Sequence, residues 1–255
     1  GDSAKILAAH AGIDPFPPLA HPVWGSLVWL VKWIPLGGLA IRVNMVSALF
    51  GGACVWLMYS LIARIAHDRT NEEIGSSFVP ATVQMISGLF AALFLAISTP
   101  FWIVSTRAFP TTLDIFMFML AIRLLFAIGH QQRPLYLYLF AFLCGVGVVE
   151  YATFIVWLPV LWIVALVLAW MVGLMTSRII GAAILWFLLG LSLYLLEAWR
   201  YYLTPAYGWR DFQGFFQVVW YIWRDQYRLI TTSMPQVGWL MVFLVSCLPF
   251  IMVLA

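Results

Sequence analysis

The chain has 255 residues, of which 64% are hydrophobic and only 9% are charged, and its formal net charge is +3. Soluble domains carry about 25% charged residues, so this composition excludes a soluble globular protein and indicates a helical integral membrane protein. The small net charge comes without a basic cluster, which argues against nucleic-acid binding. Cys54, Cys144 and Cys247 lie within apolar runs and are predicted to be buried thiols, neither disulfides nor metal ligands.

Residues 1–24 form a polar stretch that is interrupted by prolines. They lack the charged start and apolar core of a cleavable signal peptide. No apolar anchor precedes the first predicted span, so we expect this chain to be a fragment whose start lies upstream.

Apolar runs of about the length that crosses a bilayer begin after this stretch. We predict seven membrane spans, at residues 44–65, 79–97, 112–128, 135–149, 152–172, 179–196 and 237–254. Residues 134–172 as a single helix would be about 58 Å long, nearly twice the hydrocarbon thickness. We therefore predict a break near Glu150, with a separate span on either side.

Residues 198–235 are aromatic and amphipathic, and we predict that they lie along the membrane interface without crossing it. Lysine and arginine counts would place the long loops in the cytoplasm by the positive-inside rule. Cations that bind a phosphate would distort this count, so charge alone leaves the orientation open.

Four motifs then appear in a fixed order. They are "GDSAKILAAHAGIDPFPPLAHPVW" with a following "IRVN", "STPFW" at residues 98–102, "GVGVVEYAT" at residues 145–153, and "YGWRDFQGFFQVVWYIWRDQY" at residues 207–227. Together they resemble a protein O-mannosyltransferase-like family, formerly of unknown function, within the GT-C superfamily of membrane glycosyltransferases. That family includes an animal transmembrane O-mannosyltransferase and many bacterial relatives.

The resemblance implies an all-α, polytopic transmembrane bundle of GT-C type, formed by residues 1–255 as one domain with interfacial helices in its external loops. It implies an enzyme that moves a sugar from a polyprenyl-phosphate donor to a protein or glycan acceptor outside the cytoplasm. Residues 1–40 would be the first external loop, and the missing first span would precede them. We expect a bacterial inner-membrane protein whose active site faces the periplasm or the exterior. Its expected partners are membrane lipid and, as an open alternative, subunits of a membrane complex.

Asp2 is the predicted catalytic base, because the resemblance implies an acid in the first external loop and the acceptor must lose a proton. The alternative is a structural role, in which Asp2 only caps a short helix that follows it. We expect no cofactor. A divalent metal is left open, because His10 and His21 supply two of the about three ligands that a site needs.

Arg107, Arg42 and Arg228 are predicted to bind the donor phosphate, since a guanidinium donates paired hydrogen bonds to phosphate oxygens. Their alternative role is to snorkel to the membrane interface. Glu150 and His21 are predicted to bind substrate as well. A carboxylate at membrane depth costs several kcal/mol unless it is paired or hydrated, although Glu150 could also be a solvated turn residue.

Two departures from the family pattern support a different reading. Lys5 replaces the family's glutamate, and "TRAFPTT" replaces its Ala-Glu-Val-Tyr segment. The alternative function is therefore a catalytically degenerate scaffold subunit of a larger membrane complex. A transporter is disfavoured, because the sequence has neither an internal repeat nor paired broken helices.

Overall fold

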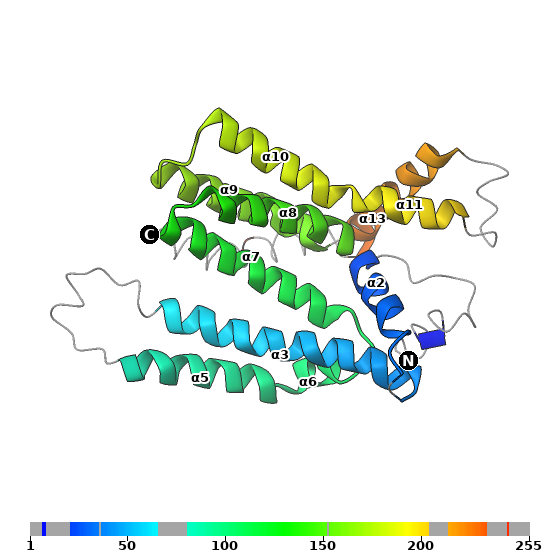
Figure 1. The fold of residues 1–255 in the computed structure, drawn as a ribbon, viewed down its shortest axis with the longest axis horizontal. Helices are drawn as coiled ribbons and strands as arrows, with labels where there is room; N and C mark the ends of the chain where they lie inside the picture. Colours follow the sequence, from blue (N-terminus) through cyan, green and yellow to red (C-terminus); the bar gives the residue numbers. More distant parts are fainter. Residues whose placement is uncertain are drawn as a thin grey trace. The chain divides into compact units, whose positions relative to one another are not determined.

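The computed structural model describes residues 7–8, 21–35, 37–65, 81–151, 153–203, 214–233 and 244. Within these ranges the main elements are all α-helices, and the predicted all-α class is confirmed. They are α2 (Pro22–Val31), α3 (Leu39–Ile65), α5 (Ala81–Ile97), α6 (Thr99–Ser105), α7 (Thr111–Gln131), α8 (Pro134–Glu150), α9 (Thr153–Met171), α10 (Ser177–Leu191), α11 (Leu193–Leu203) and α13 (Phe215–Ser233), labelled in Figure 1. The predicted break at Glu150 is confirmed by the end of α8 there.

Four segments among the described residues are long and apolar enough to cross a membrane, which is compatible with an integral membrane protein. They are Leu39–Arg64, Thr111–Gln131, Phe154–Met171 and Ser177–Leu203, and α5 with α6 would add a fifth if this pair, bent by 68°, is one broken span. The predicted seven spans are not supported. One reason is that α8, with 17 residues, rises only about 26 Å. Another is that the predicted span 237–254 lies, apart from Leu244, outside the described residues.

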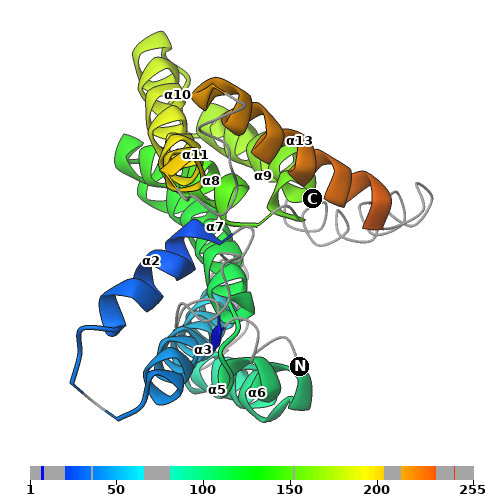
Figure 2. The same cartoon turned by 90° about the vertical axis from the view of Figure 1, so that its right-hand side faces the viewer.

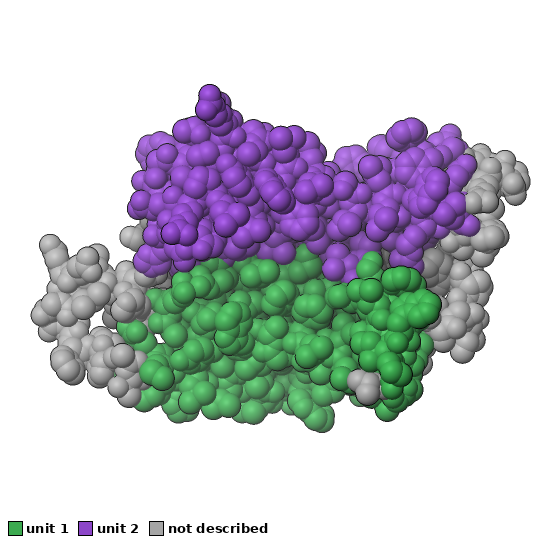
Figure 3. All heavy atoms as spheres, viewed as in Figure 1, with its two compact units in different colours: residues 1–18, 24–123 green, residues 19–23, 124–255 purple. Residues whose placement is uncertain are grey.

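The chain forms two compact units, coloured in Figure 3. Unit 1 contains Gly1–Pro18 and Trp24–Arg123, and unit 2 contains Leu19–Val23 and Leu124–Ala255. Helices α2 and α7 contribute residues to both units. The prediction of a single domain over residues 1–255 stays a prediction.

In unit 1, α3 packs against α5 and α6, as Figures 1 and 2 show. The contact with α6 is close, because a Cβ atom on Gly51 would lie 2.7 Å from the Cβ atom of Ser105. Helix α5 exposes large apolar side chains such as Leu89, Phe90 and Phe94. An exposed apolar face of this kind is typical of a helix that contacts lipid.

In unit 2, α8 packs closely against α10. A Cβ atom on Gly145 would clash with the carbonyl oxygen of Phe187, and one on Gly190 would clash with that of Phe142. The two glycines lie opposite each other and let the backbones approach. Small residues have this role at helix contacts in membranes, where apolar side chains gain little by leaving lipid.

Helix α13 packs its apolar face on α11, where Val218 joins a buried cluster with Ala198 and Tyr201. Its other side exposes Phe216, Trp220 and further aromatic side chains. Helix α13 is not among the candidate membrane spans of the described residues. The interfacial position predicted for residues 198–235 stays a prediction.

Candidate functional site

The predicted site residues are distributed over both units. Asp2, Lys5 and His10 lie outside the described residues, so the role of Asp2 as base stays a prediction. Among the other predicted residues, Arg42 and Arg107 belong to unit 1, and His21, Glu150 and Arg228 belong to unit 2.

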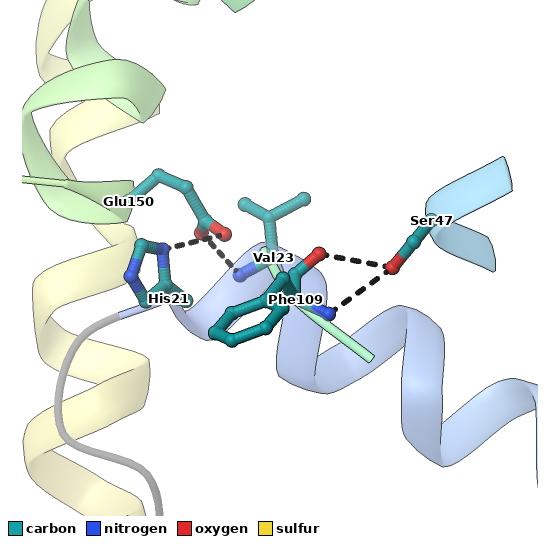
Figure 4. Close-up of polar contacts among 5 residues, drawn as sticks. All are labelled: His21, Val23, Ser47, Phe109 and Glu150. Carbon is teal, nitrogen blue, oxygen red and sulfur yellow. Dashed lines mark hydrogen bonds and ion pairs between the residues drawn. The ribbon is translucent and has the colours of Figure 1, made fainter. Parts of the chain in front are cut away.

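Glu150 is the best defined of these residues. It is the last residue of α8, and its side chain is 0% exposed. Its Oε2 atom accepts a hydrogen bond of 2.7 Å from the backbone N–H of Val23, and its Oε1 atom lies 3.6 Å from Nδ1 of His21. Figure 4 shows both contacts. The structure thus brings two predicted site residues, Glu150 and His21, into contact.

The local sequence explains this arrangement. Pro22 begins α2, and proline suits the first helical position because its missing N–H has no helical partner there. Val23 is the next residue, so its N–H is one of the donors that the helix leaves unpaired. His21 has a φ of 93°, a left-handed conformation that is uncommon for a residue with a Cβ atom. The carboxylate of Glu150 supplies the acceptor for the start of α2.

Glu197 is a second buried acid in unit 2, and the sequence interpretation passed over it. Glu197 is 5% exposed, and its Oε2 atom lies 3.7 Å from Nη1 of Arg200. The "EAWR" tetrapeptide, an acid three residues before an arginine at the end of an apolar run, is the signal that could have identified it.

Arg107 lies in the connection between α6 and α7 of unit 1, and it is exposed beside the buried Ala108. A side chain of α3 fixes this connection. The hydroxyl of Ser47 donates a hydrogen bond of 2.9 Å to the carbonyl oxygen of Phe109 and accepts one of 3.3 Å from its N–H (Figure 4). Arg107 is therefore an exposed cation on a connection with defined anchors.

Arg42 contacts the end of α2 within unit 1. Its Nη1 atom donates to the carbonyl oxygens of Lys32 at 2.6 Å and Ile34 at 2.8 Å, with Val31 at 3.4 Å. A cation that binds the last carbonyls of a helix stabilises its C-terminus. This nitrogen is thus engaged by the backbone, and phosphate binding by Arg42 stays a prediction.

Arg228 is exposed on α13, and its carbonyl oxygen accepts a hydrogen bond of 2.6 Å from Oγ1 of Thr232. This bond involves only the backbone of Arg228, so phosphate binding by its guanidinium stays a prediction.

The comparison with protein families agrees with the resemblance read from the motifs. Residues 17–174, more than half of the chain, match the family described as Protein O-mannosyl-transferase TMEM260 N-terminal domain. The matched segment contains His21, Arg42, Arg107 and Glu150. No curated protein and no solved structure matches the chain. Because the match covers residues that extend from the start of α2 through α9, we conclude that this chain belongs to the Protein O-mannosyl-transferase TMEM260 N-terminal domain family.

Proposed function

We propose that this chain is the membrane portion of a GT-C-type glycosyltransferase. It transfers a sugar, mannose according to the family's description, from a polyprenyl-phosphate donor to an extracytoplasmic protein or glycan. The family match over residues 17–174 is the observation that carries the proposal. The apolar helices support it as well, because the prenyl chain of the donor must stay in apolar surroundings. Burial of each methylene there is favourable by about 0.8 kcal/mol of free energy.

The transfer step assigns one task to each kind of side chain. The acceptor oxygen attacks the anomeric carbon of the sugar, and the bond between that carbon and the phosphate oxygen breaks. The electron pair leaves with polyprenyl phosphate, while the acceptor proton passes to the carboxylate of Asp2. Arginine stabilises the departing phosphate, whose negative charge develops in the transition state. The proposal requires no cofactor.

Arg107 is the principal phosphate-binding residue of this proposal. It is exposed, and Ser47 anchors the connection that carries it, so the backbone beside Arg107 needs little ordering before the guanidinium binds. Arg228 is assigned the same role on α13. These assignments require the loop between α6 and α7 to face the extracytoplasmic side.

A catalytically degenerate scaffold is the second candidate. It is favoured by Lys5 at the position where the family has glutamate. A scaffold of this kind would keep the membrane helices and lack transferase activity. The same assay separates the two functions.

The test is sugar transfer by the purified full-length chain in lipid vesicles that contain radiolabelled polyprenyl-phosphate mannose and an acceptor peptide. The wild type is expected to transfer label, and Asp2→Asn is expected to abolish transfer because a carboxamide cannot take the proton. A wild-type chain without transfer to any hydroxyl-bearing peptide or glycan acceptor would favour the scaffold.

The Arg107→Ala variant tests the phosphate site. Loss of a charged hydrogen bond to phosphate costs about 1.5–3 kcal/mol, so donor binding should weaken by roughly ten- to hundredfold. Acceptor binding should change little, since the acceptor carries no phosphate. Arg178→Ala, which removes another exposed arginine, is the matched control and should leave donor binding unchanged. Equal donor affinity in the Arg107→Ala and wild-type chains would contradict the assignment.

A further inference from the structure

Glu150 occupies an unfavourable place in its own helix. It is the last residue of α8, where the helix dipole presents its negative end, and its carboxylate is fully buried. Burial and the dipole both disfavour a negative charge there. The carboxylate must therefore be stabilised by groups outside α8.

The start of α2 supplies those groups within unit 2. The N–H of Val23 donates to Oε2 of Glu150 at 2.7 Å, and Nδ1 of His21 lies 3.6 Å from Oε1. A carboxylate is favoured at a helix N-terminus, where unpaired N–H groups and the positive end of the dipole meet. The same charge that is misplaced at the end of α8 is well placed at the start of α2.

The backbone conformation of His21 indicates that neighbouring contacts hold the residue that precedes α2. Its φ of 93° lies in the left-handed region, which is unfavourable for a side chain with a Cβ atom. Such a conformation persists where neighbouring contacts hold it. The contact with Glu150 is one that can hold it, because the carboxylate lies 3.6 Å from Nδ1 of His21 and accepts a hydrogen bond from the N–H of Val23.

We propose that Glu150 is a positioning residue that fixes the start of α2, rather than a residue that contacts the sugar. Its carboxylate is already engaged and is closed to solvent. Asp2 precedes His21 in the sequence, so the start of α2 is where the segment that carries the proposed base joins this helix. The consequence for transfer rests on the proposed function, whereas the structural role of Glu150 does not.

The structural role is tested by amide hydrogen exchange of the full-length chain in lipid vesicles. Glu150→Ala removes the acceptor of the Val23 N–H, and caps of this kind contribute about 0.5–2 kcal/mol to a helix. Exchange in the first turn of α2 should therefore be roughly two- to thirtyfold faster. Glu197→Gln is the matched control, because it neutralises another buried acid of unit 2 and leaves the bond to Val23 in place.

Unchanged exchange in the first turn of α2 would overturn the proposal, as would equal acceleration by Glu150→Ala and Glu197→Gln. If the Glu150→Ala variant does not fold, Glu150→Asp is measured in its place. Its shorter side chain withdraws the carboxylate from Val23, and it should accelerate exchange in the same turn.

Kinetics distinguishes positioning from contact with the sugar. Glu150→Ala should lower kcat by roughly ten- to hundredfold, with little change in the KM for the donor. Glu150→Gln should restore most of kcat, because its amide oxygen can accept from the Val23 N–H. A raised donor KM in both variants would instead indicate sugar contact. If the wild-type chain had no transferase activity, the proposed function would be wrong. The hydrogen-exchange result would still test the structural role of Glu150.

Discussion

Ser47, Arg42 and Glu150 perform the same task at three places. Each uses a polar side chain of one helix to bind backbone groups of another segment, namely Phe109, the end of α2 and the start of α2. A helix leaves backbone groups unpaired at both ends, and each of these groups needs a hydrogen-bond partner. Polar residues in so apolar a chain are therefore valuable where helices begin and end.

At the residue scale, Ser47 offers a direct test. Ser47→Ala leaves the N–H and the carbonyl of Phe109 without this partner, so we expect the free energy of unfolding to fall by about 1–3 kcal/mol. Thermal unfolding of the detergent-solubilised chain would measure the change. Donor binding should weaken as well, because the connection that carries Arg107 loses an anchor.

Ser60→Ala is the matched control for this prediction. Ser60 lies on the same helix, and its hydroxyl donates to the carbonyl of Leu57 one turn earlier in α3. Its loss should therefore leave the α6–α7 connection and donor binding unchanged. Equal effects of the two substitutions on donor binding would show that Ser47 does not act through Phe109.

The sequence identified several residues of these contacts but not their partners. Glu150 was predicted to bind substrate at a break between two spans; the structure confirms the break, and substrate binding stays a prediction. Arg42 was predicted to bind phosphate, yet its Nη1 atom binds carbonyls at the end of α2. Spacing along the chain places a cation near a turn. It does not specify whether the guanidinium meets a ligand or a neighbouring carbonyl, because that depends on how two helices pack.

At the element scale, the contact between α8 and α10 depends on two glycines. Gly145 begins the motif at residues 145–153, but neither it nor Gly190 was assigned a packing role from the sequence, since a glycine in an apolar run has no distinctive pattern until its neighbour is known. Their Cα atoms are close enough that a Cβ built on either glycine would lie 3.0 Å from the Cα of the other. Side chains larger than hydrogen would separate the backbones.

Gly190→Ala should therefore destabilise unit 2. The added methyl group would meet backbone atoms of α8, including the nitrogen of Val146 at 2.8 Å. Overpacking of this kind costs about 1–3 kcal/mol. Gly181→Ala on the same helix is the control, because nothing lies within 4 Å of its added Cβ atom. It should be neutral or stabilising, since alanine favours helix by about 1 kcal/mol over glycine. Similar unfolding midpoints for both variants would contradict the close contact.

At the scale of the whole molecule, the number of spans was harder to predict than the helices themselves. Composition and the length of apolar runs identify apolar helices in the right places, including α3, α7 and α9. Helix α8 shows why counting fails. With 17 residues it rises only about 26 Å, a length that suits either a short span or a helix packed within protein. Hydropathy alone cannot separate the two cases.

The orientation proposed for the active site can be tested on α7. This helix, Thr111–Gln131, is long and apolar enough to cross the membrane, so its two flanks should lie on opposite sides. Thr106 and Gln132 are exposed residues on these flanks. In sealed cells expressing Thr106→Cys or Gln132→Cys, an impermeant thiol reagent should label position 106 and should reach position 132 only after the membrane is opened. Labelling of position 132 alone would place the loop of Arg107 in the cytoplasm. Arg107 could not then act on a donor at the external face, and the positive-inside count would be the better guide to orientation.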